Sequence, residues 1–122
     1  MQTEMATPHF AFTPPRGYFW LLEREIIGFD SPTRLRPWYF LAEPWDVQKT
    51  WPQGPSKDSL VAFARRQDND DIACLEVVGG KAVRVVLIHG WTSEGYVVCE
   101  SYENFWEWIK GVIDDIAQEP EP

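Results

Sequence analysis

The sequence predicts an α+β fold: an antiparallel sheet of about five or six strands, packed on one side by helices that include a C-terminal helix. Between residues 59 and 100, four strand-like runs follow one another, separated by connectors of three to seven residues. Connectors this short join antiparallel neighbours, because parallel neighbours need a crossover of a dozen or more residues. A stretch with helical spacing follows the last run and predicts a helix that covers the sheet.

The length of 122 residues favours one domain over residues 1–122, large enough to bury a core without disulfides. Residues 1–15 contain three prolines and little periodicity, so we expect them to lie loosely on the fold. Residues 18–29 fit two structures equally well. One is a helix with Thr13 as its N-cap, and the other is a strand rich in aromatic and β-branched residues.

Residues 38–43 predict a short strand. Residues 44–58 predict a loop, or a loop with one helical turn, because four of these fifteen residues are Pro or Gly. The later strands are expected at 59–64, 72–78, 82–89 and 96–100. Between the second and third of these strands, Gly79-Gly80 predicts a hairpin turn.

The C-terminal helix is expected over residues 102–117, with Ser101 as its N-cap. Its apolar stripe is expected to consist of Tyr102, Phe105, Trp106, Ile109, Val112, Ile113 and Ile116. Ile109 and Ile113 should therefore face the sheet, whereas Trp108 lies off the stripe and should be exposed. Residues 118–122 are polar and broken by proline, so we expect them to be loosely ordered.

The two cysteines, Cys74 and Cys99, each lie inside an apolar, strand-like run. Two cysteines do not make a disulfide framework, so we expect both to be reduced and buried. Neither a secretory signal sequence nor an apolar run long enough to span a bilayer is visible. The expected location is therefore the cytoplasm.

The net charge of −8, from 11 basic and 19 acidic residues, argues against a nucleic-acid partner, because phosphates are met by Lys and Arg. The same charge allows a basic protein partner, whose approach it would steer. Seven Trp are more than one small core usually needs, which favours an aromatic-rimmed groove or interface.

Catalytic motifs are sparse. The sequence contains no GxSxG elbow, no Cys or His spacing typical of zinc and no phosphate loop, so we expect no metal and no cofactor. A Cys–His nucleophile would need Cys74 or Cys99 beside His89, with a lowered thiol pKa. His89 is the strongest single candidate for an enzyme site, and the alternative is a half-buried imidazole at a strand end.

The segment FARRQDNDDIACLE, residues 63–76, packs several charges between two apolar runs. In a calcium loop Asp68 and Asp70 would fit the first two ligand positions, but Ile72 stands where the third ligand belongs. A turn explains the segment better, because Asp and Asn suit turn geometry. We expect Asp68 to Asp71 to form the exposed tip of a hairpin between the first two of the later strands.

The same segment resembles the signature of the SMI1/KNR4 family, also called the SUKH superfamily. The resemblance covers about residues 37–117 and is carried by Phe63-Ala64, Asp71, Cys74-Leu75-Glu76, the strand Val85 to His89, and the helix with Ser101 and Phe105. Two residues depart from the family pattern. Asp70 stands where the family usually has glycine, and Tyr102 replaces the usual Phe.

Many bacterial members of this family are understood as immunity proteins that neutralise secreted polymorphic toxins, often nucleases. The resemblance therefore implies a non-enzymatic, protein-binding module whose partner is a basic toxin domain, such as a nuclease. Two alternatives stay open: a regulatory domain that binds a small ligand or peptide in an aromatic groove, and a hydrolase that uses His89.

The expected binding surface is acidic and includes Asp68, Asp70 and Asp71 at the hairpin tip. These carboxylates would act mostly on the rate of encounter with a basic partner. Trp91 would supply affinity, and Glu94 in the neighbouring connector would extend the surface.

Overall fold

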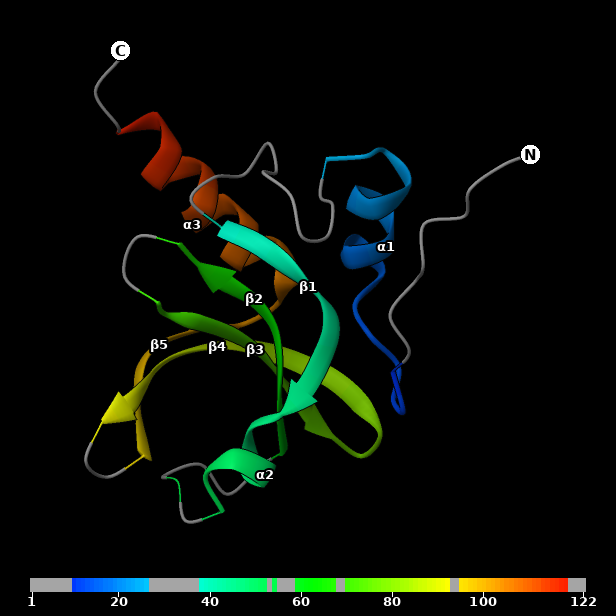
Figure 1. Ribbon diagram of the computed structural model, residues 1–122. Helices are drawn as coiled ribbons and strands as arrows, with labels where there is room; N and C mark the ends of the chain where they lie inside the picture. Colours follow the sequence, from blue (N-terminus) through cyan, green and yellow to red (C-terminus); the bar gives the residue numbers. More distant parts are fainter. Residues whose placement is uncertain are drawn as a thin grey trace.

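The computed structural model describes residues 10–26, 38–52, 54, 59–67, 70–92 and 95–118. Its elements in chain order are α1 (Arg16–Glu23), β1 (Trp38–Asp46), α2 (Val47–Thr50), β2 (Ser59–Arg66), β3 (Ile72–Val78), β4 (Lys81–Thr92), β5 (Gly95–Tyr102) and α3 (Phe105–Ala117) (Figure 1). Of the helices in this part of the chain, none combines the length and apolarity that crossing a membrane requires.

The five strands form one sheet in the order β1-β2-β3-β4-β5, and every neighbouring pair is antiparallel. This arrangement confirms the predicted α+β fold with its meander. Gly79 and Gly80 join β3 to β4 with φ angles of 60° and 75°, the left-handed values that a two-residue hairpin turn requires at both positions. Glycine adopts these values without strain, which explains the sequence at this point.

A bulge in β2 changes the side of the sheet to which its side chains point. On β2, Ala62 pairs with Cys74 and Ala64 pairs with Ala73, so Phe63 has no partner of its own on β3. As a result the consecutive residues Phe63 and Ala64 both join the same apolar cluster, although neighbours along a regular strand point to opposite faces.

The helices α1 and α3 cover one face of the sheet, which we call the helical face (Figure 1). The Tyr18 ring lies near its centre, with centroid distances of 5.9 Å to Phe40, 6.3 Å to Phe63 and 6.4 Å to Phe105. Trp108 of α3 adds a ring 5.2 Å from Phe63. Edge and tilted contacts of this kind stabilise a core beyond the area that they bury.

The opposite face carries a second cluster that α2 covers only in part. Val47 of α2 is fully buried there, and the Trp51 ring lies 5.5 Å from the Tyr96 ring. A Cβ atom on Gly90 would lie 2.6 Å from the Trp51 ring, so Trp51 can pack against β4 only because residue 90 is glycine. This contact accounts for the glycine at position 90, between His89 and Trp91.

The region predicted as helix or strand at residues 18–29 forms the helix α1, which ends at Glu23, and residues 27–29 lie outside the described part. Its N-cap is Pro15, not Thr13. Thr13 instead hydrogen-bonds the turn after β3: its N–H donates to Gly80 at 2.9 Å, and its carbonyl accepts from Ala82. Residues 10–15, expected to be loose, are therefore held in place, whereas residues 1–9 lie outside the description.

The C-terminal helix is confirmed, but its start and its buried stripe differ from the prediction. The backbone of Ser101 and Tyr102 continues β5, and Asn104 is the N-cap, accepting from the Glu107 N–H at 3.0 Å. The buried positions are Phe105, Trp108, Ile109 and Val112, which follow i, i+3, i+4, i+7 spacing. The expected stripe had the wrong phase because it began on the strand.

Three side chains of this helix therefore correct the prediction. Trp108 is buried, with 1% of its surface exposed, whereas Ile113 is 52% exposed and Trp106 is exposed as well. Ile109 faces the sheet as predicted, because it belongs to both the predicted and the observed stripe.

The two cysteines also differ from each other. Both are free, as predicted, and Cys74 in β3 is fully buried. Cys99 is exposed, because β5 is an edge strand that pairs, among the described residues, with β4 alone. An apolar, strand-like run does not reveal its position in the sheet, and the expectation that Cys99 is buried was wrong for that reason.

Candidate functional site

A cavity of about 550 Å³ lies between α3 and the sheet, at the end where β1 begins and β2 ends. Its described lining comes from β1, β2, β4, β5, α3 and the turn before β3. The lining includes Trp38, Arg66, Asp71, Cys99, Glu100, Tyr102, Glu107, Lys110, Gly111, Asp114 and Asp115. We call this cavity the acidic pocket.

A bulge on β5 supplies two neighbouring lining residues. Leu87 pairs with Glu100 and Ile88 pairs with Val98, which leaves Cys99 as the extra residue. Consequently Cys99 and Glu100 both line the pocket, where a regular strand would turn one of them away.

A glycine of α3 shapes the same wall. A Cβ atom on Gly111 would lie 3.2 Å from the Tyr102 hydroxyl oxygen, so glycine lets the phenol and the helix approach closely. The pocket wall thus consists of β5 and α3 in direct contact.

Acidic side chains dominate the described lining, with five carboxylates against two cations. Both cations are engaged: Arg66 Nη1 lies 3.4 Å from Asp115 Oδ2, and Lys110 Nζ lies 3.0 Å from Glu107 Oε2. Within the described residues, no cation forms an ion pair with Glu100 or Asp114. The pocket therefore keeps an excess of negative charge.

The pKa values of two neighbouring groups respond to this environment. Burial raises the pKa of Tyr102, and a hydrogen bond to Glu100 together with the charges of Glu100 and Asp115 raises it further. Partial burial against the pocket wall and the charges of Asp71 and Glu100 also raise the pKa of Cys99. An anionic surrounding stabilises the protonated form of both groups, so the pocket suits a cation better than an anion.

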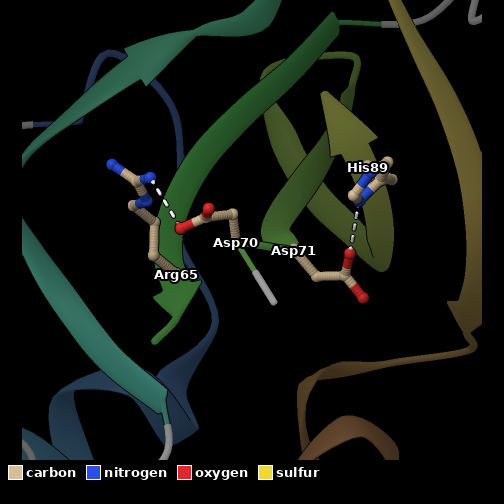
Figure 2. A network of polar contacts seen from close by, with 4 residues as sticks. All are labelled: Arg65, Asp70, Asp71 and His89. Carbon is tan, nitrogen blue, oxygen red and sulfur yellow. Dashed lines mark hydrogen bonds and ion pairs between the residues drawn. The ribbon is translucent and has the colours of Figure 1, made fainter. Parts of the chain in front are cut away.

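The turn between β2 and β3 carries the polar contacts that Figure 2 draws. Asp70 accepts from Arg65 Nη2 at 3.2 Å, and Asp71 Oδ1 lies 3.0 Å from His89 Nδ1 on β4. The two carboxylates point to opposite sides (Figure 2), and of the two only Asp71 lines the pocket. Asp70 has a φ of 63°, a left-handed value that Asp tolerates and glycine favours.

The structure brings together only part of the predicted surface. Asp70 and Asp71 lie at the β2–β3 turn as predicted, but each is engaged by a partner on a different side. Asp68 and Glu94 lie outside the described residues, and Trp91 is placed within β4 without a description of its side chain.

The binding surface predicted from the sequence did not include the carboxylates of α3 and β5. Asp114 and Asp115 follow Glu107 by seven and eight positions on α3, and that spacing places them along the same side of the helix as Glu107. This signal was present in the sequence. The sequence did not indicate that Glu100 belongs to the same group, because the side of the sheet to which Glu100 points depends on the bulge at Cys99.

Neither thiol has the lowered pKa that a cysteine nucleophile requires. Burial raises the pKa of Cys74 far above its ordinary value of 9.0, and the pKa of Cys99 is raised as well. In the part of the chain described, no group of three or more His, Cys, Asp or Glu side chains is arranged to hold a metal ion.

Comparisons with protein-family models, with curated proteins and with solved structures found no match to this chain. The resemblance to the SMI1/KNR4 family stays a prediction from the sequence.

Proposed function

We propose that the protein is a non-enzymatic binding module for a basic protein partner, and that the acidic pocket receives cationic side chains of that partner. The observation that carries the proposal is the excess of five carboxylates over two cations in the described lining, in a chain of net charge −8. Long-range attraction of this sign speeds the encounter with a basic protein.

The pocket offers more than charge. Tyr102 lines it beside the carboxylates, and a guanidinium or ammonium group can lie over such a ring. An arginine of the partner would meet planar acceptors and aromatic surface together, a combination that Arg recognises better than Lys.

The resemblance to the SMI1/KNR4 family narrows the proposal to an immunity protein of a bacterial polymorphic toxin system, with a basic toxin domain such as a nuclease as the partner. The left-handed φ of Asp70 supports this reading, since the family usually has glycine there. The two free cysteines fit a reducing compartment, so the proposed location is the cytoplasm.

The test reverses the charges in the pocket and compares a matched control. Glu100→Lys with Asp114→Lys changes the pocket, and Glu23→Lys with Glu25→Lys makes the same charge change on and just after α1. The partner is first identified by pull-down with the wild-type chain or from the adjacent gene. Association rates are then measured by stopped flow over a range of salt concentrations.

The pocket variant should associate at least about tenfold more slowly at low salt, with a flatter salt dependence, because steering acts through local charge. The α1 variant should lose much less. Equal association rates for the pocket variant and the wild type would show that the acidic pocket is not part of the interface.

A second candidate function is binding of a small cation. The pocket volume of about 550 Å³ lies within the range of about 300–1,000 Å³ typical of ligand sites. Calorimetry with argininamide and spermidine separates the candidates. Micromolar binding that the pocket variant abolishes would favour a small ligand, whereas no binding up to millimolar concentration would favour the protein partner.

A further inference from the structure

The two edges of the sheet are built differently. Edge strands expose unpaired backbone groups, and proteins usually block them with prolines, charges or irregular pairing. In β1 the register shifts between Phe40 and Trp45, so that Leu41 to Pro44 face the single residue Phe63 of β2. Pro44 has no N–H to offer, and Glu43 and Asp46 add charges. This edge is protected against another strand.

The β5 edge lacks most of this protection. Its residues are GYVVCESY, with no proline and no Lys or Arg. Val97 and Val98 are each 47% exposed, and Cys99, Glu100 and Ser101 are exposed as well. The single irregularity on β5 itself, the extra residue Cys99, bends the strand without ending it, since pairing with β4 resumes at Glu100.

We propose that β5 accepts an extended strand of the basic partner, which adds to the sheet as a sixth strand by backbone hydrogen bonds. The proposal rests on the proposed function and specifies how the partner docks. Two valines of β5 stay about half exposed although an apolar edge promotes aggregation, and a docking strand explains why such a surface is kept.

The register of β5 defines what the incoming strand should carry. Glu100 pairs with Leu87 and faces the helical face beside the pocket, whereas Val98 pairs with Ile88 and faces the opposite side. A docked strand therefore places a cationic side chain near Glu100 and an apolar one near Val98. This alternation describes a basic amphipathic strand.

A second copy of this chain is the other candidate occupant, and charge argues against it. Each copy carries a net charge of −8, and two β5 strands side by side would bring two acidic pockets close together. Like charges at such an edge repel, whereas a basic strand is attracted. We therefore assign the edge to the basic partner.

The probes are three peptides with equal charge. One is an octapeptide of alternating Val and Lys, the second is the same peptide methylated at every backbone nitrogen, and the third is octalysine with four lysines acetylated. Binding is followed by fluorescence polarisation. Cys99 serves as a built-in reporter, because a strand on β5 should protect this exposed thiol from alkylation.

The alternating peptide should bind at least about tenfold more tightly than its methylated analogue, as expected when several backbone hydrogen bonds are lost. It should also slow alkylation of Cys99. On the protein side, Val98→Lys should weaken binding strongly, and the matched Val83→Lys should not, since Val83 is similarly exposed but lies in β4.

The outcomes separate the two proposals. If the methylated and unmethylated peptides bind equally, and the pocket variant Glu100→Lys with Asp114→Lys weakens both, the strand-docking inference fails and the proposed function stands. If no peptide binds up to millimolar concentration, or the pocket variant binds them unchanged, both proposals fail. If sedimentation shows that the chain alone dimerises and that Val98→Lys abolishes the dimer, the occupant is a second copy and the inference is overturned.

Discussion

The strands β3 and β5 have similar compositions and opposite environments. Each carries valines, one cysteine and one glutamate, in the sequences IACLEVV and GYVVCESY. The first five residues of β3 are buried, whereas β5 is exposed from Val97 to Ser101. The difference comes from their places in the sheet, since β3 lies at the centre and β5 at an edge.

This contrast teaches that strand propensity and strand position are separate pieces of information. Apolar and β-branched residues fit a pleated surface wherever it lies, so they identify a strand without saying how many neighbours it has. An apolar strand at an edge then calls for a different explanation from one at the centre. Packing accounts for β3, and for β5 we propose docking.

The largest expected effect concerns the two thiols. Cys99 should react with an alkylating reagent in the native protein, whereas Cys74 should react only through unfolding that exposes β3. With a typical unfolding free energy of 5 kcal/mol or more, the rates should differ by at least about 10³-fold. Mass spectrometry of timed samples measures both alkylation rates. Comparable rates would contradict the difference in exposure between β3 and β5.

Truncation of apolar side chains should show the same contrast in stability. Leu75→Ala in β3 removes a fully buried side chain and should cost about 2–5 kcal/mol. Val98→Ala in β5 should cost no more than about 0.5 kcal/mol, as at surface sites. Urea unfolding compares the two variants. A large loss for Val98 would mean that β5 contributes to the core despite its exposure.

The helix α3 allows the comparison within one element. Ile109 is buried and Ile113 is exposed, so Ile109→Ala should cost about 2–5 kcal/mol and Ile113→Ala about 0.5 kcal/mol or less. The two substitutions change the same side chain four residues apart, so each controls for the other. Equal losses in thermal unfolding would favour the stripe predicted from the sequence over the observed one.

Alkaline pH should destabilise the protein through β3. The folded state raises the pKa of Cys74 above its ordinary value of 9.0, so the unfolded chain loses a proton that the folded chain keeps. Stability therefore falls as the pH rises above about 9, and the thiol should account for a loss on the order of 1 kcal/mol between pH 8 and pH 10. Cys74→Ala should remove this part of the pH dependence, whereas Cys99→Ala should leave most of it in place.

The smallest expected effect lies in the turn that leads into β3. Asp70→Gly removes a left-handed residue, which gains up to about 1 kcal/mol, and loses the exposed pair with Arg65, which costs a similar amount or less. Stability should change by no more than about 0.5 kcal/mol. The control Asp71→Gly loses the contact with His89 and should cost more in urea unfolding. A loss of stability for Asp70→Gly that exceeds the loss for Asp71→Gly would show that the Asp70 carboxylate has a structural role.

Most of the fold could be predicted from the sequence, because the meander depends on local signals. Short connectors, the Gly79-Gly80 turn and apolar, strand-like runs place β2 to β5 within a few residues of their observed bounds. The phase of α3 was mispredicted because Tyr102 reads equally well as helix or strand, and only its pairing with Val85 decides the matter.

The site was predicted less well, because it depends on irregularities and on tertiary contact. The turn residue Asp71 was identified, but its partner His89 is eighteen residues away and meets it only through the pairing of β3 with β4. The bulge at Cys99 points the Glu100 side chain toward the pocket, and no sequence pattern predicts a bulge at this position.

The cluster around Tyr18 has a consequence for folding during protein synthesis. Tyr18 is made early, yet its ring packs against Phe105 in α3, which leaves the ribosome after the whole sheet. The hairpins from β2 to β5 can pair as they emerge, because each joins neighbours along the chain, whereas α1 must wait for contacts far along the sequence. Until α3 has been synthesised, the apolar side of α1 lacks its α3 partner. We expect nascent-chain chaperones to bind that side.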